Sequence, residues 1–180
     1  MHITIATPLF PPDQDETARY TKTLAASLGK EDTISVLLYG SLPESVTNTA
    51  LITISKNTPL PIRMFSFAWK LIFSLKKTDM LYVINGPSVE FPVLLASYIR
   101  NIPIILIIAD MHAHTTTIHN SFTHQVHRAL VRRSVATVSA QHSMLVRPVL
   151  HPLENYPTTA MEAYERSWKN HLMEIKNKSI

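Results

Sequence analysis

Apolar residues recur along the chain in short runs whose period changes between two and about 3.6 residues. Alternating or continuous apolar runs predict six β-strands, at 2–7, 34–39, 50–54, 80–84, 103–109 and 135–139. Helical spacing predicts helices between them, at about 15–28, 61–77, 88–100 and 122–133. The continuous apolar runs at 81–84 and 104–109 are typical of strands that are buried on both faces of a sheet.

This alternation predicts an α/β domain with a doubly wound, mostly parallel, Rossmann-like sheet. We expect the domain to span residues 1–147, followed by a proline-rich connector at 148–157 and a C-terminal helix at 158–180 that packs back on it. A capping box formed by Thr159 and Glu162 begins that helix. In such folds ligands bind at the carboxyl ends of the strands, so the loops there are the first place to look for a site.

The composition narrows the class of protein. Hydrophobic residues make up 46% of the 180 residues and charged residues 17%, which is typical of a globular domain. The absence of cysteine excludes disulfides, thiolate metal sites and cysteine nucleophiles. The excess of 17 Lys and Arg over 13 Asp and Glu is mild, and we expect no nucleic-acid partner. No apolar run reaches the roughly 20 residues of a spanning helix and no basic leader precedes the first strand, so we expect a cytoplasmic protein, with peripheral membrane contact left open.

The opening segment ITIATPLFPPDQDETARYTKTLAASL resembles the start of family 4 glycosyltransferases of the GT-B fold. Those enzymes begin with a strand, a Phe-Pro-Pro loop, a Gly-Gly pair and a helix that carries an Arg or Tyr and a Thr. Shorter similarities continue in register at 78–80, 101–103 and 138–139, and the segment EAYERSWKNHLMEI resembles the last helix of complete GT-B enzymes. The resemblance covers nearly all 180 residues, but only as the N-terminal, acceptor-side domain.

The resemblance implies a glycosyltransferase-like protein that is one half of a split or truncated sugar-transferring enzyme. It would act on the acceptor side with a separate donor-binding partner subunit, and a homo-oligomer is a second arrangement to consider. The alternative is a non-catalytic binding or scaffold module that keeps the GT-B half-fold. Autonomous activity is not expected, because sugar transfer needs donor and acceptor held together in a water-poor cleft. No cofactor is expected.

Two departures from the family pattern affect the chemistry. Where the family has Gly-Gly, this chain has Asp15 and Glu16, whose carboxylates would repel a donor diphosphate. Where the family often has an active-site His before an Asp, this chain has Ala109 before Asp110, and His112 follows in the loop. The catalytic residue therefore stays unassigned.

The candidate ligand-binding residues follow the predicted strands or begin the first helix. They are Asp15, Glu16, Asn85, Asp110, His112 and Ser139. Asp110 could bind an acceptor hydroxyl or act as a base, or it could cap the following turn. Ser139 lies near His142 and Ser143, but no Gly-x-Ser-x-Gly elbow is present, which argues against a hydrolase.

Six histidines lie between residues 112 and 142. A metal site built from His112, His114, His124 and His127 is one hypothesis, since imidazole is a common nitrogen ligand. No zinc-ligand spacing is present and no acidic residue follows Asp110 in this stretch, so we expect no metal and favour a polar, solvated loop and helix face.

Two segments suggest interaction surfaces. The predicted helix from Pro61 to Lys77 mixes aromatic residues with basic ones, which suits peripheral contact with an anionic membrane but also a core helix with basic ends. Leu9 and Phe10 follow the first strand. If they are exposed, a partner or self-association is expected; otherwise Phe10 folds onto the first helix.

Overall fold

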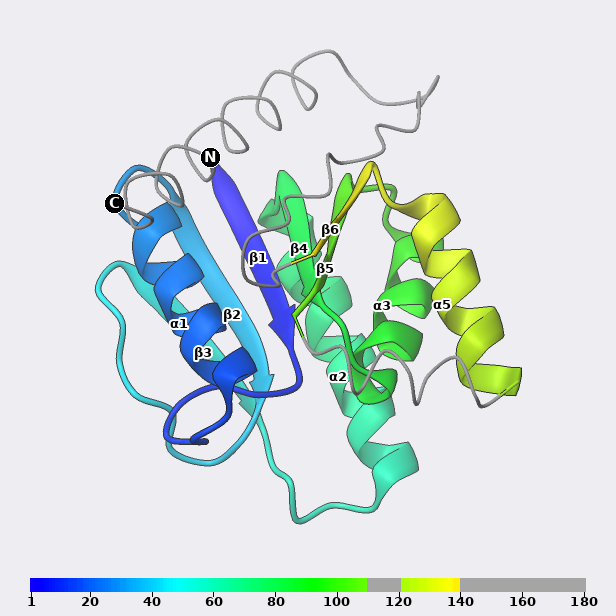
Figure 1. Cartoon of the computed structure of the whole chain (residues 1–180), viewed down its shortest axis with the longest axis horizontal. Coiled ribbons are helices and arrows are strands. Elements are labelled where there is room, and N and C mark those ends of the chain that lie inside the picture. The colour runs from blue at the N-terminus through cyan, green and yellow to red at the C-terminus, as the bar shows by residue number, and fades with distance from the viewer. Residues whose placement is uncertain (110–120, 140–180) are drawn as a thin grey trace.

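The computed structural model describes residues 1–109 and 121–139, which form one parallel six-stranded sheet with helices on both faces (Figure 1). The strands are β1 (His2–Thr7), β2 (Thr33–Tyr39), β3 (Thr49–Ile54), β4 (Met80–Ile84), β5 (Ile104–Ile108) and β6 (Ala136–Ser139). The helices are α1 (Glu16–Leu28), α2 (Leu60–Ser74) with the short 3-10 helix η1 (Leu75–Lys77), α3 (Pro87–Ile99) and α5 (Ser121–Arg133). The predicted doubly wound, Rossmann-like fold class is confirmed.

The order of the strands places a topological switch point in the middle of the sheet. The order is β3-β2-β1-β4-β5-β6, so the chain runs outward from β1 in one direction and then from β4 in the other. Strand β1 pairs with both neighbours, and Ile5 lies level with Val36 on β2 and with Tyr82 on β4. In sheets of this type ligands bind at the carboxyl ends of the strands beside such a switch point.

Alternate residues of each strand enter two different cores. Ile3 and Ile5 face the α1 side of the sheet, where they pack with Leu24 and Leu28 of α1. On the other side Leu81 and Val83 join residues of α2, α3 and α5. Both faces of the central strands are therefore dry, which explains their continuous apolar sequence. Each fully buried Leu or Ile side chain contributes about 1.5–3 kcal/mol relative to exposure.

Local sequence signals account for the ends of α1. The carboxylate of Asp15 accepts a hydrogen bond from the amide of Thr17 at 2.7 Å, which makes it the N-cap. At the other end the amide of Gly29 donates to the carbonyl of Ala25 at 2.9 Å. Helix α2 begins differently, since Pro59 precedes it without a side-chain cap and Pro61 lies in its first turn.

Several expectations lie outside the described residues. These are the connector at 148–157, the C-terminal helix at 158–180, and the loop that carries Asp110 and His112. Within residues 1–109 and 121–139, no helix is long and apolar enough to cross a membrane.

Candidate functional site at the carboxyl ends of the strands

Backbone hydrogen bonds join the loops that follow β1, β2 and β3. The amide of Glu44 donates to the carbonyl of Pro11 at 3.0 Å, which joins the second loop to the first. The amide of Gly40 donates to the carbonyl of Ile54 at 2.9 Å, which joins the ends of β2 and β3. The three loops therefore form one surface on the β1–β3 side of the switch point.

Thr7, the last residue of β1, sets the path of the first loop. Its hydroxyl donates to the carbonyl of Leu9 at 2.8 Å and lies 3.3 Å from the hydroxyl of Thr21 on α1. Thr7 is fully buried, so these bonds hold the turn against α1 in a dry environment. The peptide bond between Pro11 and Pro12 in this loop is cis.

This turn directs Phe10 into the protein. Phe10 is 2% exposed and packs in the α1-side core with Ile5 and Leu24, while Leu9 is half-buried. The condition for a partner surface at this loop, an exposed Phe10, is therefore not met, and the alternative, in which Phe10 folds down toward the first helix, is confirmed. The physical reason is that the Thr7 hydroxyl holds the turn through the carbonyl of Leu9, beside Thr21 of α1, so that the ring of Phe10 reaches this core.

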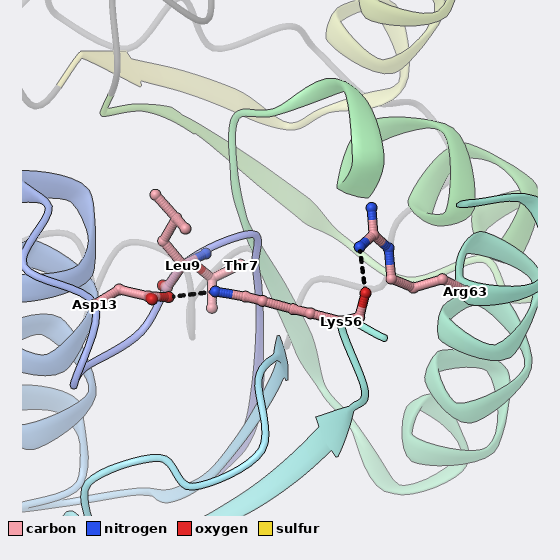
Figure 2. Close-up of polar contacts among 5 residues, drawn as sticks. All are labelled: Thr7, Leu9, Asp13, Lys56 and Arg63. Atoms are coloured by element: carbon pink, nitrogen blue, oxygen red, sulfur yellow. Dashed lines mark hydrogen bonds and ion pairs between the residues drawn. The ribbon is translucent and has the colours of Figure 1, made fainter. Parts of the chain in front are cut away.

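A groove of about 370 Å³ lies between these three loops. It is lined by residues 10–13, 38–43 and 55–57. On its wall the ammonium of Lys56 pairs with the carboxylate of Asp13 at 2.7 Å, and the guanidinium of Arg63 donates to the carbonyl of Lys56 at 3.3 Å (Figure 2). The ion pair connects the loop after β3 with the loop after β1.

A second groove, of about 890 Å³, lies alongside α1. It shares residues 11–13 with the first groove and continues along the polar face of the helix past Arg19 and Lys30. Its own ion pair joins Lys22 of α1 to Glu44 at 2.5 Å. Each groove is therefore lined by one lysine–carboxylate pair: Lys56–Asp13 in the first groove and Lys22–Glu44 in the second.

Tyr39, a buried residue at the end of β2, forms part of the lining of the first groove. Its hydroxyl donates to the carbonyl of Ser88 at 2.8 Å, and its ring lies 4.8 Å from that of Phe67 and 5.2 Å from the guanidinium carbon of Arg63. Burial raises the pKa of the Tyr39 hydroxyl above its ordinary value, and the Arg63 charge only partly offsets this effect. The hydroxyl therefore remains a hydrogen-bond donor at neutral pH.

Asn85 joins β4 to β5 on the other side of the switch point. Its side-chain oxygen accepts from the amide of Ala109 at 2.8 Å, and its own amide donates to the carbonyl of Ile107 at 2.8 Å. The residue is 1% exposed. A Cβ added to the adjacent Gly86 would lie 3.1 Å from the Cγ of Pro8, so glycine permits the close approach of these two loops.

A buried contact between a carboxylate and an imidazole, which the sequence analysis missed, lies beside Gly86. One carboxylate oxygen of Glu90 accepts from the amide of Gly86 at 3.2 Å, and the other lies 2.9 Å from Nδ1 of His127 on α5. Both side chains are buried, so the expectation of a solvated helix face is wrong for His127. The sequence contained a signal that Glu90 is buried, because Glu90 lies between Val89 and Val93 on the buried side of its helix.

The predicted ligand-binding residues that the structure describes lie in different parts of the fold. Asp15 caps α1 and Glu16 is exposed in its first turn, whereas Asn85 is buried as a link between strands. Ser139 ends β6 level with Ile108 of β5. Asp110 and His112 lie outside the described residues. Within the described parts of the chain, no three His, Asp or Glu side chains gather in a way that could hold a metal ion.

No protein-family model matches the chain, and no curated protein matches it. Solved structures do share its fold. Anabaena Alr3699/HepE in complex with UDP and glucose aligns with a TM-score of 0.53 at 15% identity over 76% of this chain and 37% of that one. UDP-GlcNAc 2-epimerase from Neisseria meningitidis bound to UDP-GlcNAc aligns with a TM-score of 0.52 at 14% identity over 77% of this chain and 40% of that one. This chain therefore spans about two fifths of the length of these proteins, and the likeness establishes a shared Rossmann-like fold.

Proposed function

We propose that this domain is the acceptor-side half of a glycosyltransferase-like protein of the family 4 type, acting with a separate donor-binding partner. The observation that carries the proposal is the 370 Å³ groove at the carboxyl ends of β1, β2 and β3. Its volume lies within the range of small-molecule sites, and it lies at the carboxyl edge of the sheet, which is the edge at which doubly wound sheets bind ligands.

The lining of this groove suits a sugar. Pro12 and Leu42 offer exposed apolar surface for the C–H faces of a sugar ring. Polar groups for its hydroxyls come from Ser41, Ser55, Asn57 and the Lys56–Asp13 pair, which together provide donors and acceptors. The paired charges cancel, so the groove favours a neutral, hydroxyl-rich ligand over a highly charged one.

The N-terminus of α1 supports the acceptor-side assignment. A helix N-terminus with accessible amides attracts phosphate groups. Here the carboxylate of Asp15 already accepts from the Thr17 amide, and the exposed Glu16 adds a second negative charge. A donor diphosphate would meet repulsion at this end of the helix, which favours a donor site on another domain.

Saccharide titration of the ¹⁵N-labelled full chain tests this proposal. A panel of neutral mono- and disaccharides should shift amide signals in the loops after β1, β2 and β3, whereas UDP- and GDP-sugars should not bind at micromolar concentration. Lys56→Ala should weaken saccharide binding about tenfold, which corresponds to one hydrogen bond to a charged group. Lys22→Ala, which opens the matched ion pair in the other groove, should leave it unchanged. Micromolar binding of a nucleotide sugar to the chain alone would overturn the proposal.

The second candidate function is a non-catalytic binding module, and Ala109 favours it. Ala109, directly after β5, has a methyl side chain at the position where the resemblance places a catalytic imidazole. Its backbone amide donates a hydrogen bond to the side-chain oxygen of Asn85. The complex co-purified from the native source separates the two candidates. Sugar transfer from a UDP- or GDP-sugar that is lost in Asp110→Ala supports the enzyme, whereas saccharide binding without transfer supports the module.

A further inference from the structure

Helix α2 has a second apolar face that the core does not use. Its buried face consists of Phe67, Ala68 and Leu71, which pack on the sheet. The opposite face carries Ile62, Phe65, Trp69 and Phe73 at spacings of 3, 4 and 4 residues, and they are 61%, 66%, 55% and 49% exposed. The rings form a continuous row: Phe65 stacks on Trp69 at a centroid distance of 6.3 Å, and Trp69 meets Phe73 edge to face at 5.1 Å.

The neighbouring helices extend this apolar surface. Helices α2, α3 and α5 lie side by side on one face of the sheet, so their outward sides face the same direction (Figure 1). Helix α3 exposes Leu95, Tyr98 and Ile99. Phe91 of α3 and Phe122 of α5 lie 5.8 Å apart and are both exposed. Single exposed apolar residues are common on soluble proteins, but a patch that spans three helices indicates an interaction site.

The charges around this surface have one sign. Residues 45–78 contain no Asp or Glu. Within α2, η1, α3 and α5 the one acidic residue is Glu90, which is 1% exposed and paired with His127. Basic residues are frequent on the same elements: Arg63, Lys70, Lys76, Lys77, Arg128, Arg132 and Arg133. Lys76 lies 4.8 Å from the centre of the Phe73 ring, so cationic and aromatic groups are directly adjacent.

We propose that the outward surface of α2, α3 and α5 docks on an anionic lipid membrane. The rings of Phe65, Trp69 and Phe73 then lie in the membrane interface. Lys76, Lys77 and Arg132 lie against the lipid headgroups. Aromatic rings favour the boundary between headgroups and acyl chains, and basic side chains are attracted to anionic lipid. The charge pattern selects this occupant. A second copy of the chain would place the same basic residues opposite each other, whereas an anionic bilayer complements them.

Vesicle binding by the full chain tests the proposal. Co-sedimentation should show binding to vesicles of phosphatidylcholine with 30% phosphatidylglycerol and at least tenfold weaker binding to phosphatidylcholine alone, with loss of binding as salt is raised. The triple variant Phe65→Ser, Trp69→Ser, Phe73→Ser should lose at least tenfold in affinity. Leu42→Ser removes an apolar side chain that is 82% exposed in the loop after β2, outside the three helices, and should have no effect on vesicle binding.

Matched charge variants separate a local effect from net charge. Lys76→Glu and Lys30→Glu change the net charge equally, but Lys30 is exposed on the α1 side of the molecule. Lys76→Glu should weaken binding several-fold and Lys30→Glu should not. Equal effects of the two variants, or equal binding to neutral and anionic vesicles, would overturn the proposal.

Fluorescence tests the depth of insertion without altering the surface. The sequence has two tryptophans, Trp69 and Trp168, so the Trp168→Phe chain reports on Trp69 alone. Brominated acyl chains in anionic vesicles should quench it. An absence of quenching, or a lipid-free dimer in analytical ultracentrifugation that the triple serine variant dissociates, would assign the surface to another partner and refute membrane docking.

Discussion

Helices α1 and α2 both pack one face against the sheet, but their outward faces differ in chemistry. The outward side of α1 carries Arg19, Lys22 and Thr23 and lines a polar groove, and no large apolar residue of α1 is exposed. The outward side of α2 carries aromatic rings, of which Phe65 and Trp69 are more than half exposed. The difference shows that α2 is more apolar than its packing on the sheet requires.

The exposed aromatic residues of α2 form a second apolar stripe that packing on the sheet does not require. One apolar stripe is enough to bury a surface helix, and the rest of such a helix is normally polar. Helix α1 follows this rule, with Leu24, Ala25 and Leu28 buried. In α2 the buried stripe contributes to folding, whereas the exposed stripe contributes little to the stability of the isolated chain and is available for another environment.

The largest expected effect separates the two faces of α2. Phe67→Ala removes a fully buried ring that contacts Tyr39, and it should lower the free energy of unfolding by about 3–5 kcal/mol in urea titration. Phe65→Ala removes the same side chain two residues earlier at an exposed position, and it should change the stability by no more than about 0.5 kcal/mol. Similar losses for the two variants would mean that the outer face is packed as well.

The next effect compares the buried Glu90–His127 contact on one side of the sheet with an exposed ion pair on the other. Glu90→Ala leaves His127 without its carboxylate in a buried site and should cost about 3 kcal/mol. Glu44→Ala opens the exposed pair with Lys22 and should cost less than about 1 kcal/mol. A double-mutant cycle with His127→Ala measures the coupling of the buried pair; a coupling near zero would show that Glu90 acts through the Gly86 amide instead.

The fold was predictable because its signals are local or repeated. Strands buried on both faces produce continuous apolar runs, as in Ile104–Ile108, and caps such as Asp15 lie next to the helices that they begin. Every described strand and α-helix was therefore expected, with bounds that differ by at most one residue, except that the helix predicted to end at Lys77 ends as α2 at Ser74 and continues as the 3-10 helix η1. The acidic pair at the start of α1, Asp15 and Glu16, was also visible in the sequence.

The site was less predictable because it depends on distant residues. Phe10 is buried in a core that also includes Leu24 of α1, and Glu90 meets His127 across 37 positions of sequence. The groove is formed by three loops that meet only after the sheet has formed. The pattern of a single sequence contains no signal for such long-range contacts. The roles of Asp110, His112 and the C-terminal helix remain predictions.

Alkaline titration probes the α1 side. Burial, together with the nearby Tyr82, raises the pKa of the Tyr20 hydroxyl, so the unfolded chain releases this proton at a lower pH than the folded chain. Stability should therefore be unaffected below about pH 10 and fall above it, by up to about 1.4 kcal/mol per pH unit for each such tyrosine. Tyr20→Phe should flatten the decline measured by urea unfolding from pH 9 to 11.5. An unchanged slope in Tyr20→Phe would contradict the burial of this hydroxyl.

The smallest expected effect concerns how the two helices begin. Helix α1 has the Asp15 side chain as its N-cap, whereas α2 begins at Pro59 without a side-chain hydrogen bond. Asp15→Ala should therefore cost about 1 kcal/mol, because the Thr17 amide loses its acceptor and the positive end of the helix dipole loses a negative charge. Gln14→Ala, at the exposed preceding position, is the control and should stay within about 0.5 kcal/mol. Thermal unfolding of the two variants measures the difference, and equal midpoints would show that α1 is held in place by its buried face alone, as α2 is.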